Sequence, residues 1–386
     1  MSTTAGVPIS GHCDPRFAGV RDAFAQNFAQ HGERGAAVCL SVEGRVVVDL
    51  AGGWRDEGRA WEPDTLVNVF SVGKAMLSLA DVMLASAGAL DLDAPLARLW
   101  PAFAAGDKGA ITLRQVLSHQ AGLPAIAHRL APGAMLDWRV MCDALAAQTP
   151  WWEPGTAHGY HVNTFGYLVG EIVARASGRP FARFFRDTVA GPLGADVHFG
   201  VSVADDDRVA PFLGHDTPSA EQEPEGLSRD ALMEYNAYAN PSGLSGMGVV
   251  NTRAWRAAVI PSTNGHASAR GVARVFQAMA AGGSIGGVTL TSADWLAAAA
   301  TEQVSGEDLI LHRPSRFGLG FQLSQPERPL GPNPGAFGHF GAGGSLGLCD
   351  PAAGVAFGYV MNTMGPRWQH PRNAALLAAV YACLGA

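Results

Sequence analysis

The feature that most constrains the fold of this chain is an almost wholly apolar segment that begins at Ser71 and ends near Gly88. Large apolar side chains would fall on every face of a helix formed by this segment: Met76, Leu77, Leu79, Met83 and Leu84. A helix that is apolar all round is buried rather than laid on a surface, so we predict a buried helix over 71–88. The composition permits such a core, because 48% of the 386 residues are hydrophobic and 16% are charged.

The two ends of the chain have the pattern of an α/β unit. Apolar positions at helical spacing over 15–31 precede two Val-rich runs, 36–42 and 45–51, and the Glu43-Gly44 pair between these runs is typical of a hairpin turn. After residue 266, a helical stretch is followed by strand-like runs with turn signals between them and by a final helix, at 267–281, 317–323, 336–341, 345–349, 355–362 and 372–383. This alternation predicts an antiparallel meander.

The middle of the chain contains no convincing run of strands. Residues 92–262 carry many proline and glycine breaks and several short helical stretches, such as 112–119, 164–177 and 181–188. We therefore predict a discontinuous α/β lobe formed by 1–91 and 267–386, around a mostly helical insertion lobe over 92–266. The predicted fold class is α/β plus all-α, with an antiparallel sheet flanked by helices.

Charge and cysteine content limit the partners and the compartment. The formal net charge of −7 argues against a nucleic-acid surface and gives little attraction to anionic membranes. Residues 1–10 have neither the basic nor the apolar region of a secretory signal, and no apolar run is long enough to span a bilayer. The five cysteines are scattered and form no C-x-x-C pair, which predicts free thiols. We expect a cytoplasmic protein with a small-molecule partner, and a homo-oligomer stays open.

A serine and a lysine at the start of the predicted buried helix form the main candidate site. Ser71 and Lys74 are three residues apart and share a helix face, so the amine can reach the hydroxyl. Lys74 is one of only two lysines among 27 basic residues, and lysine, unlike arginine, can lose its proton in a protein. A desolvated amine has a lowered pKa, and the helix N-terminus favours a developing anion. This combination predicts an activated serine nucleophile.

Ser71-Val72-Gly73-Lys74 is also the first of four motifs that occur in a characteristic order. The others are Leu117-Ser118-His119-Gln120-Ala121-Gly122-Leu123, then Trp152-Glu153-Pro154-Gly155-Thr156 followed by Tyr160 and Gly166-Tyr167-Leu168-Val169-Gly170, and then Phe337-Gly338-His339-Phe340-Gly341-Ala342-Gly343-Gly344-Ser345. With this combination the chain resembles the serine β-lactamases and penicillin-binding proteins, especially the class C-like branch that contains family VIII carboxylesterases. The resemblance implies a β-lactamase/transpeptidase-like fold.

The resemblance also implies a tyrosine whose phenol lies near both members of the serine–lysine pair and moves a proton to the leaving group. Two tyrosines are candidates. Tyr238-Ala239-Asn240 matches the Y-A-N form of class C enzymes, but Pro241 follows it, so no helix continues from there. Tyr160 is a poorer match, with Val162 where asparagine is frequent, but it leads into the predicted helix over 164–177. We choose Tyr160.

The third motif supplies candidates for substrate binding. His339-Phe340-Gly341 stands where many relatives have Lys-Thr-Gly, and esterase-type relatives often have histidine here, so the resemblance favours ester substrates. A purely structural role for His339 is equally open. We expect the backbone N–H groups of Ser71 and Ala342 to form an oxyanion hole. His339, Gly341 and Trp152 are the candidates for substrate contact, although a tryptophan such as Trp152 more often belongs to the core or the wall of a cleft than to a specific ligand contact.

Two further patterns are rejected as functional sites. Gly343-Gly344-Ser345-Leu346-Gly347 has the G-x-S-x-G form of an α/β-hydrolase nucleophile, but strand-like residues follow it directly, and His370 is the only later histidine. His158 and His161 have the H-x-x-H spacing of metal ligands, but no acidic or cysteine partner completes the set.

We therefore predict a serine hydrolase, specifically a carboxylesterase that cleaves small acyl esters through an acyl-enzyme on Ser71. Lys74 and Tyr160 are its expected proton-transfer groups. Alternatives on the same fold are a β-lactamase, a D-amino-acid peptidase or amidase, and an acyltransferase that uses an alcohol or amine as acceptor. A non-catalytic binding module is the alternative of a different class. The prediction involves no cofactor, no metal, and no nucleic-acid or membrane partner.

Overall fold

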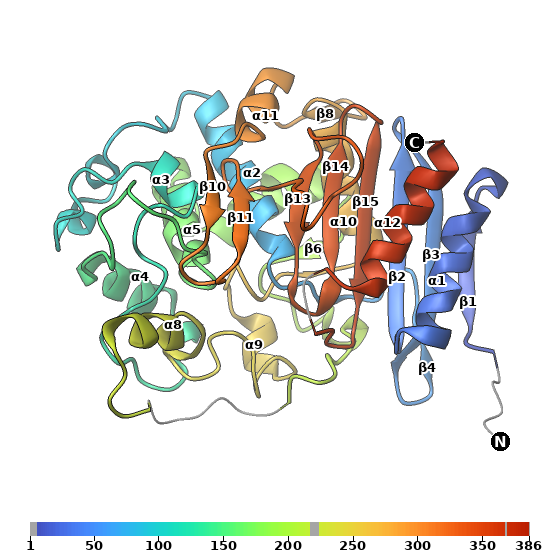
Figure 1. The fold of residues 1–386 in the computed structure, drawn as a ribbon, viewed down its shortest axis with the longest axis horizontal. Helices are drawn as coiled ribbons and strands as arrows, with labels where there is room; N and C mark the ends of the chain where they lie inside the picture. The colour runs from blue at the N-terminus through green and yellow to red at the C-terminus, as the bar shows by residue number, and fades with distance from the viewer. Residues whose placement is uncertain (1–5, 217–223, 367–368, 386) are drawn as a thin grey trace.

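A large antiparallel sheet runs through the protein, in a computed structural model that describes residues 6–216, 224–366 and 369–385 (Figure 1). Its strands are β1 (Ile9–Cys13), β2 (Gly35–Val42), β3 (Arg45–Asp56), β4 (Arg59–Ala60), β10 (Val304–Glu307), β11 (Pro314–Phe317), β12 (Gln322–Leu323), β13 (Phe337–Phe340), β14 (Leu346–Asp350) and β15 (Val355–Met361). Their spatial order is β1-β3-β2-β15-β14-β13-β12-β11-β10, and β4 pairs with β3. The N-terminal hairpin thus lies beside the last strand of the chain, because β2 pairs with β15.

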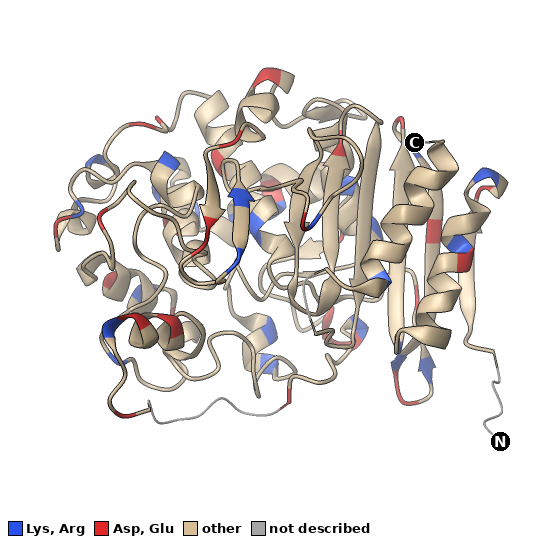
Figure 2. Cartoon of the chain, in the orientation of Figure 1, with Lys and Arg blue, Asp and Glu red and all other residues tan. Residues whose placement is uncertain are grey.

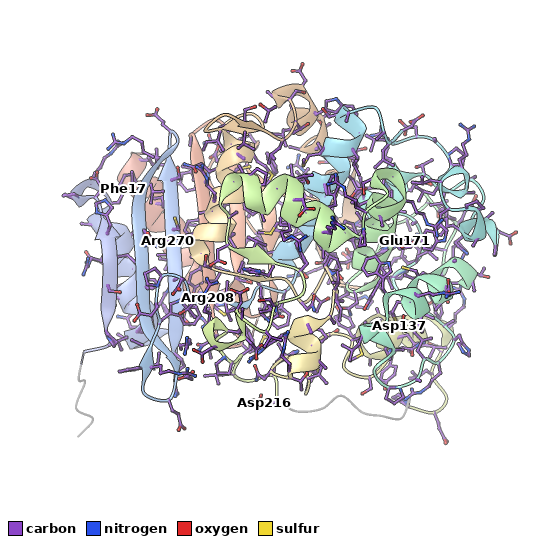
Figure 3. The ribbon with its side chains drawn as sticks, turned by 180° about the vertical axis from the view of Figure 1, so that it is seen from behind. Phe17, Asp137, Glu171, Arg208, Asp216 and Arg270 are labelled. Atoms are coloured by element: carbon purple, nitrogen blue, oxygen red, sulfur yellow. The ribbon has the colours of Figure 1, made fainter. Side chains whose placement is uncertain are left out.

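Helices cover both faces of this sheet. α1 (Ala18–Gln30) and α12 (Pro371–Leu384) pack against each other on one face, and α10 (Ala269–Ala280) packs against β2, β14 and β15 on the other. Seen from behind (Figure 3), Arg270 of α10 lies beside β3, where it pairs with Asp49 at 2.6 Å. The close approach of α10 requires glycine at 347, because a Cβ there would come within 2.1 Å of the Phe276 ring.

The remaining helices lie outside these two layers, several of them at the other end of the molecule (Figure 1). They are α3 (Leu113–Leu117), α4 (Trp138–Ala147), α5 (Thr164–Ser177), α6 (Phe181–Phe185), α7 (Gly191–Leu193), α8 (Arg229–Ala239), α9 (Arg253–Ala257) and α11 (Ala293–Ala299). Short strands also occur: β5 (Val67–Asn68) and β6 (Val197–His198) both pair with β7 (His266–Ala267), and β8 (Ser284–Ile285) pairs with β9 (Val288–Thr289). Acidic and basic residues are interspersed along the whole ribbon rather than gathered in one region (Figure 2).

The apolar segment after Ser71 forms α2 (Val72–Ser86), which lies between the sheet and the helical region. It packs against β13, α5 and α11, and every residue from Val72 to Val82 is buried. A single hydrophobic core extends from the N-terminal hairpin through α2 to α5. The predicted buried helix is therefore confirmed, and it carries the serine–lysine pair into the interior.

The predicted fold class is confirmed, with differences in detail. The expected strand over 317–323 is two strands, β11 and β12, because the chain turns between them at Gly320, whose φ is +77°. β1, β10 and α8 were not expected from the sequence. No helix among the described residues combines the length and the apolar character that crossing a membrane requires. The first five residues of the segment inspected for a secretory signal lie outside the described residues.

Candidate active site

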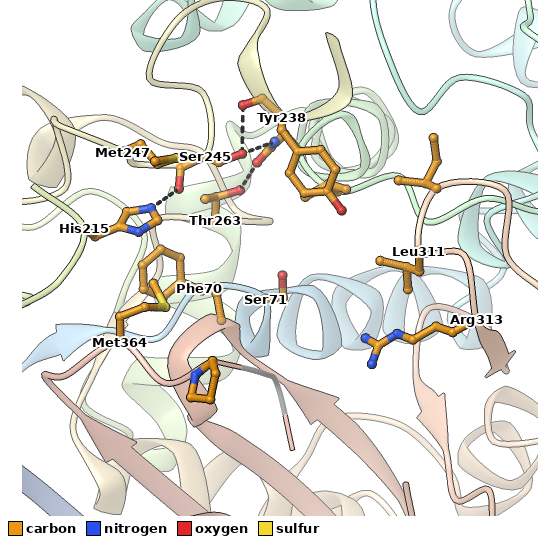
Figure 4. Close-up of a pocket in the computed structure, with 15 residues that line it drawn as sticks. Phe70, Ser71, His215, Tyr238, Ser245, Met247, Thr263, Leu311, Arg313 and Met364 are labelled. Atoms are coloured by element: carbon orange, nitrogen blue, oxygen red, sulfur yellow. Dashed lines mark hydrogen bonds between the residues drawn. The ribbon is translucent and has the colours of Figure 1, made fainter. Parts of the chain in front are cut away.

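Ser71 lies at the junction between a short strand and the buried helix α2. The chain leaves β5, passes through Phe70 in the left-handed region with φ +47°, and enters α2 with Ser71 at the N-cap position. A non-glycine residue with positive φ is strained, and such strain concentrates where a structure must hold a side chain in a set direction. Ser71 is 7% exposed, and its hydroxyl points into a cavity (Figure 4).

Lys74 lies one helical turn further on and is wholly buried. Its Nζ is 3.0 Å from Ser71 Oγ, 2.6 Å from the Val162 carbonyl oxygen and 3.0 Å from the Ser262 carbonyl oxygen. No described carboxylate forms an ion pair with it. Burial therefore lowers the pKa of the Lys74 amine well below its usual value, because a charged amine loses its hydration without gaining a counter-ion.

Tyr160, and not Tyr238, is the tyrosine that reaches this pair. The Tyr160 hydroxyl is hydrogen-bonded to Ser71, and Lys74 Nζ lies 4.7 Å from the centre of the Tyr160 ring. Tyr160 is completely buried, and burial raises the pKa of its phenol well above the usual value. Tyr238 lies near the end of α8 and lines the cavity across from Ser71 (Figure 4). The structure thus brings Ser71, Lys74 and Tyr160 together.

Two residues hold the backbone around Tyr160 in place, and the sequence did not indicate this role for either of them. His119 accepts hydrogen bonds at both neighbours of Tyr160: its carbonyl from the Gly159 N–H at 3.2 Å, and its Nδ1 from the His161 N–H at 3.1 Å. Asp308 Oδ1 accepts from the Tyr160 N–H at 2.9 Å. His119 lies in a motif that supported the family resemblance, but nothing in the sequence near Asp308 signals this contact.

His339 lies on β13 and faces Tyr160 in its neutral form. Its Nδ1 donates to the Phe340 carbonyl at 2.7 Å, which leaves Nε2 as an acceptor 3.5 Å from the Tyr160 hydroxyl. Burial, and secondarily the nearby Lys74, lowers the pKa of His339 to about 3. His339 therefore supplies no positive charge at neutral pH. It touches the tyrosine rather than the cavity.

The turn after β13 places Ala342 beside Ser71 in the wall of the cavity. Neither the Ser71 N–H nor the Ala342 N–H has a hydrogen-bond partner among the described residues. Ser345 of the rejected G-x-S-x-G pattern is fully buried, and its Oγ donates to the Val69 carbonyl at 3.0 Å. Ser345 thus ties this turn to the segment that carries Ser71. Gly341 is required at the same contact, because a Cβ would lie 2.4 Å from the Val69 carbonyl oxygen.

The cavity in front of Ser71 has a volume of about 430 Å³. Its lining is mostly apolar: Phe70, Val162, Met247, Ile310, Leu311, Ala342, Met364 and Pro366, with Ser71, Asn163, His215, Tyr238, Ser245, Thr263 and Arg313 as polar members. Trp152, a predicted substrate contact, is absent from this lining; its Nε1 donates to the Ala157 carbonyl and its ring packs on Gly159. Most lining residues come from loops without a sequence motif, which is why the sequence did not indicate them.

The H-x-x-H histidines have protein partners. His161 Nε2 accepts from the Leu123 N–H at 3.0 Å and its Nδ1 donates to the Gly159 carbonyl, whereas His158 Nε2 lies 2.9 Å from Ser315 Oγ. Among the described residues no three histidine, cysteine or acidic side chains come together as a metal site.

Comparison with known proteins agrees with this geometry. The β-lactamase family model matches residues 20–382. Esterase/β-lactamase LipL of Mycobacterium tuberculosis is 34% identical over 375 residues, which are 93% of this chain and 84% of LipL. The crystal structure of a family VIII carboxylesterase has a TM-score of 0.89 at 39% identity, covering 97% of this chain and 100% of the other. A penicillin-binding-protein homologue from Caulobacter crescentus gives 0.88 at 38% identity with the same coverage. This chain belongs to the β-lactamase family.

Proposed function

We propose that this enzyme is a serine carboxylesterase that cleaves small acyl esters through an acyl-enzyme on Ser71. The main observation behind the proposal is the 3.0 Å contact between Ser71 Oγ and the buried amine of Lys74, which forms no ion pair with a described carboxylate. The esterase named among its relatives and the carboxylesterase of similar structure support the same chemistry.

The two carbonyl contacts of Lys74 favour the neutral amine as the base. A neutral amine has two N–H donors and one lone pair. The Val162 and Ser262 carbonyl oxygens accept the two N–H groups, so the lone pair is directed at Ser71 Oγ. Lys74 can then take the hydroxyl proton as Oγ forms its bond to the ester carbonyl carbon.

Tyr160 completes the proton path to the leaving group. As the bond between the carbonyl carbon and the ester oxygen breaks, the departing alkoxide takes the Tyr160 proton, and the phenol is reprotonated from Lys74. The neutral Nε2 of His339 accepts on the other side of the phenol and keeps it oriented. A water molecule then attacks the acyl-enzyme, and the same groups move its proton back to Ser71 Oγ.

The N–H groups of Ser71 and Ala342 stabilise the negative charge on the carbonyl oxygen during both steps. Both groups lie in the wall of the cavity and are left without a protein acceptor among the described residues.

We also place the enzyme in the cytoplasm, because all five of its cysteines are free thiols.

A matched pair of serine variants tests the proposal. Ser71→Ala should lower kcat for p-nitrophenyl acetate by at least about 10⁴-fold, because it removes the nucleophile. Ser345→Ala removes only the hydrogen bond that holds the Ala342 turn, so it should lose far less turnover than Ser71→Ala. Mass spectrometry after fluorophosphonate treatment should find the adduct on Ser71. Turnover that survives Ser71→Ala would refute the assignment. A chromogenic cephalosporin assayed in parallel measures the β-lactamase alternative, for which neutral His339 offers no cation on β13.

A further inference from the structure

One end of the cavity is formed by the loop that connects β10 to β11. Ile310, Leu311 and Arg313 of this loop line the cavity. In Figure 4, Leu311 and Arg313 lie on one side of Ser71, whereas Phe70 and Met364 lie on the other. The cavity therefore has two ends, with the nucleophile between them.

Asp308 ties this loop to Tyr160. The buried Asp308 Oδ1 accepts from the Tyr160 N–H at 2.9 Å and from the Ile310 and Leu311 N–H groups at 3.0 Å each, and Oδ2 accepts from the Ser315 hydroxyl at 2.8 Å. The loop and the tyrosine are thus held as one unit. Because Tyr160 gives its proton to the leaving alkoxide in the proposed function, the loop forms the end of the cavity that receives the alcohol portion of an ester.

Arg313 gives this end its charge. Among the described residues that line the cavity, Arg313 is the only lysine or arginine, and no aspartate or glutamate is present. Its guanidinium points from the loop toward the interior of the cavity in Figure 4. Its positive charge also acts on the phenols of Tyr160 and Tyr238, although burial is the larger effect and raises the pKa of both.

A guanidinium in an apolar cavity binds a carboxylate well, because its planar donors match the two carboxylate oxygens. Its five N–H donors allow it to hold a carboxylate while it keeps a protein partner. Tyr238 adds a second donor at the cavity wall, since a tyrosine phenol keeps its proton at neutral pH.

We propose that the preferred substrates are esters whose alcohol portion carries a carboxylate, and that Arg313 binds this carboxylate at the leaving-group end. The inference rests on the proposed function and specifies its substrate class. Hydrolysis of such an ester releases a carboxylic acid and a hydroxy acid, with the departing oxygen protonated as in the reaction above.

The test compares two acetate esters that differ in one group. 3-Acetoxybenzoate carries a carboxylate on its leaving phenol, and 3-acetoxybenzamide carries a neutral amide of nearly the same shape. We expect the ratio of their kcat/KM values to fall at least about tenfold in Arg313→Gln, because one charge-assisted contact is lost. Arg313→Lys should retain part of the ratio, and 0.5 M NaCl should reduce it in the parent enzyme.

Arg316→Gln is the matched control. Arg316 lies three residues further along the chain, pairs with Glu302 and the Ser324 carbonyl, and does not line the cavity, so this variant should keep the ratio of the parent enzyme. Thermal unfolding of each variant checks that it is folded. An unchanged ratio in folded Arg313→Gln would overturn the proposal.

A second pair of esters separates the two ends of the cavity. p-Nitrophenyl hemisuccinate and p-nitrophenyl butyrate share a leaving group, but only the former has a carboxylate on its acyl part. Arg313→Gln could change the kcat/KM ratio of this second pair and leave the ratio of the two acetate esters unchanged. In that case the carboxylate binds on the acyl side and the inference is wrong. Failure of the proposed function would look different, since neither pair would be hydrolysed by the parent enzyme in a Ser71-dependent way.

Discussion

The two lysines of the chain make an instructive pair, because both are buried and neither has a carboxylate partner among the described residues. Lys108 lies beyond α2, in the loop before α3, and its Nζ donates to three carbonyl oxygens, those of Ala105 at 2.5 Å, Ala146 at 2.9 Å and Gln148 at 2.5 Å. Lys74 donates to two carbonyl oxygens, and its third neighbour is the Ser71 hydroxyl.

The difference of one carbonyl separates a structural lysine from a candidate base. Three acceptors match the three donors of a charged ammonium group. Burial lowers the pKa of Lys108 to about 8, and the charge of the neighbouring Asp107 opposes that shift. Two acceptors satisfy a neutral amine and leave its lone pair available. Burial lowers the pKa of Lys74 well below the usual value, and the charge of no described group opposes this shift. Scarcity of lysine therefore does not identify a base; the number and kind of its neighbours does.

The largest effect expected in the comparison of the two lysines comes from making the charge at position 74 permanent. Lys74→Arg should lower kcat for p-nitrophenyl acetate at least about 10³-fold, because a guanidinium does not give up its proton and cannot accept one from Ser71. Stopped-flow measurement of the acylation burst would locate the loss in the first step. Turnover within tenfold of the parent enzyme would show that Lys74 acts only as a cation, and would remove the distinction between the two lysines.

The pH dependence of acylation should follow Lys74 alone. Because the active form of a base is deprotonated, the rate of inactivation by a fluorophosphonate should fall as the pH drops through the pKa of Lys74. Burial places this pKa well below the usual value for lysine, so the fall should occur at a lower pH than the titration of an exposed lysine. Lys108→Met should leave the profile in place. A rate that keeps rising toward pH 10 would show that the Lys74 amine is charged at neutral pH.

Local spacing explains what could be predicted from the sequence. Ser71 and Lys74 are three residues apart on one helix, and the Val-rich runs of β2 and β3 are joined by a two-residue turn, so both features depend on near neighbours in the chain. Tyr160 could be chosen over Tyr238 because a helix, α5, follows it closely. The lobe boundaries near 91 and 267 stay a prediction.

Long-range contacts explain what could not be predicted. Asp308 contacts Tyr160 across 148 residues of sequence, and no sequence pattern around Asp308 predicts that contact. β1 forms from Ile9–Cys13, a segment without alternating apolar residues, because β3 offers it a partner edge. The cavity lining, Arg313 included, is likewise assembled from loops that only the completed fold brings together.

A smaller effect, on stability instead of activity, is expected at Lys108. Lys108→Met keeps most of the volume of the side chain but leaves three carbonyl groups, one of them buried, without their donor, which should lower the free energy of unfolding by about 2–4 kcal/mol. Urea unfolding followed by circular dichroism measures it, and kcat of the folded protein serves as the control. A loss below about 0.5 kcal/mol would mean that the carbonyl groups are satisfied in another way.

The smallest effect extends the comparison to Asp81, a third buried ionisable residue, which lies on the same helix as Lys74. Neither of its carboxyl oxygens has a hydrogen-bond partner in another described residue, and burial raises its pKa well above the usual value. A group with a raised pKa in the folded state loses its stabilising contribution as the pH rises from its unfolded-state pKa toward the folded one. Asp81→Asn should therefore gain stability over the parent protein by about 1 kcal/mol per pH unit above pH 5. Thermal unfolding at pH 5, 6 and 7 measures this gain. A stability difference between the two proteins that does not change with pH would show that Asp81 is ionised in the folded protein. Burial without a partner would then not be enough to keep an ionisable group on α2 neutral. The argument that burial keeps the Lys74 amine neutral would lose its support in the same way.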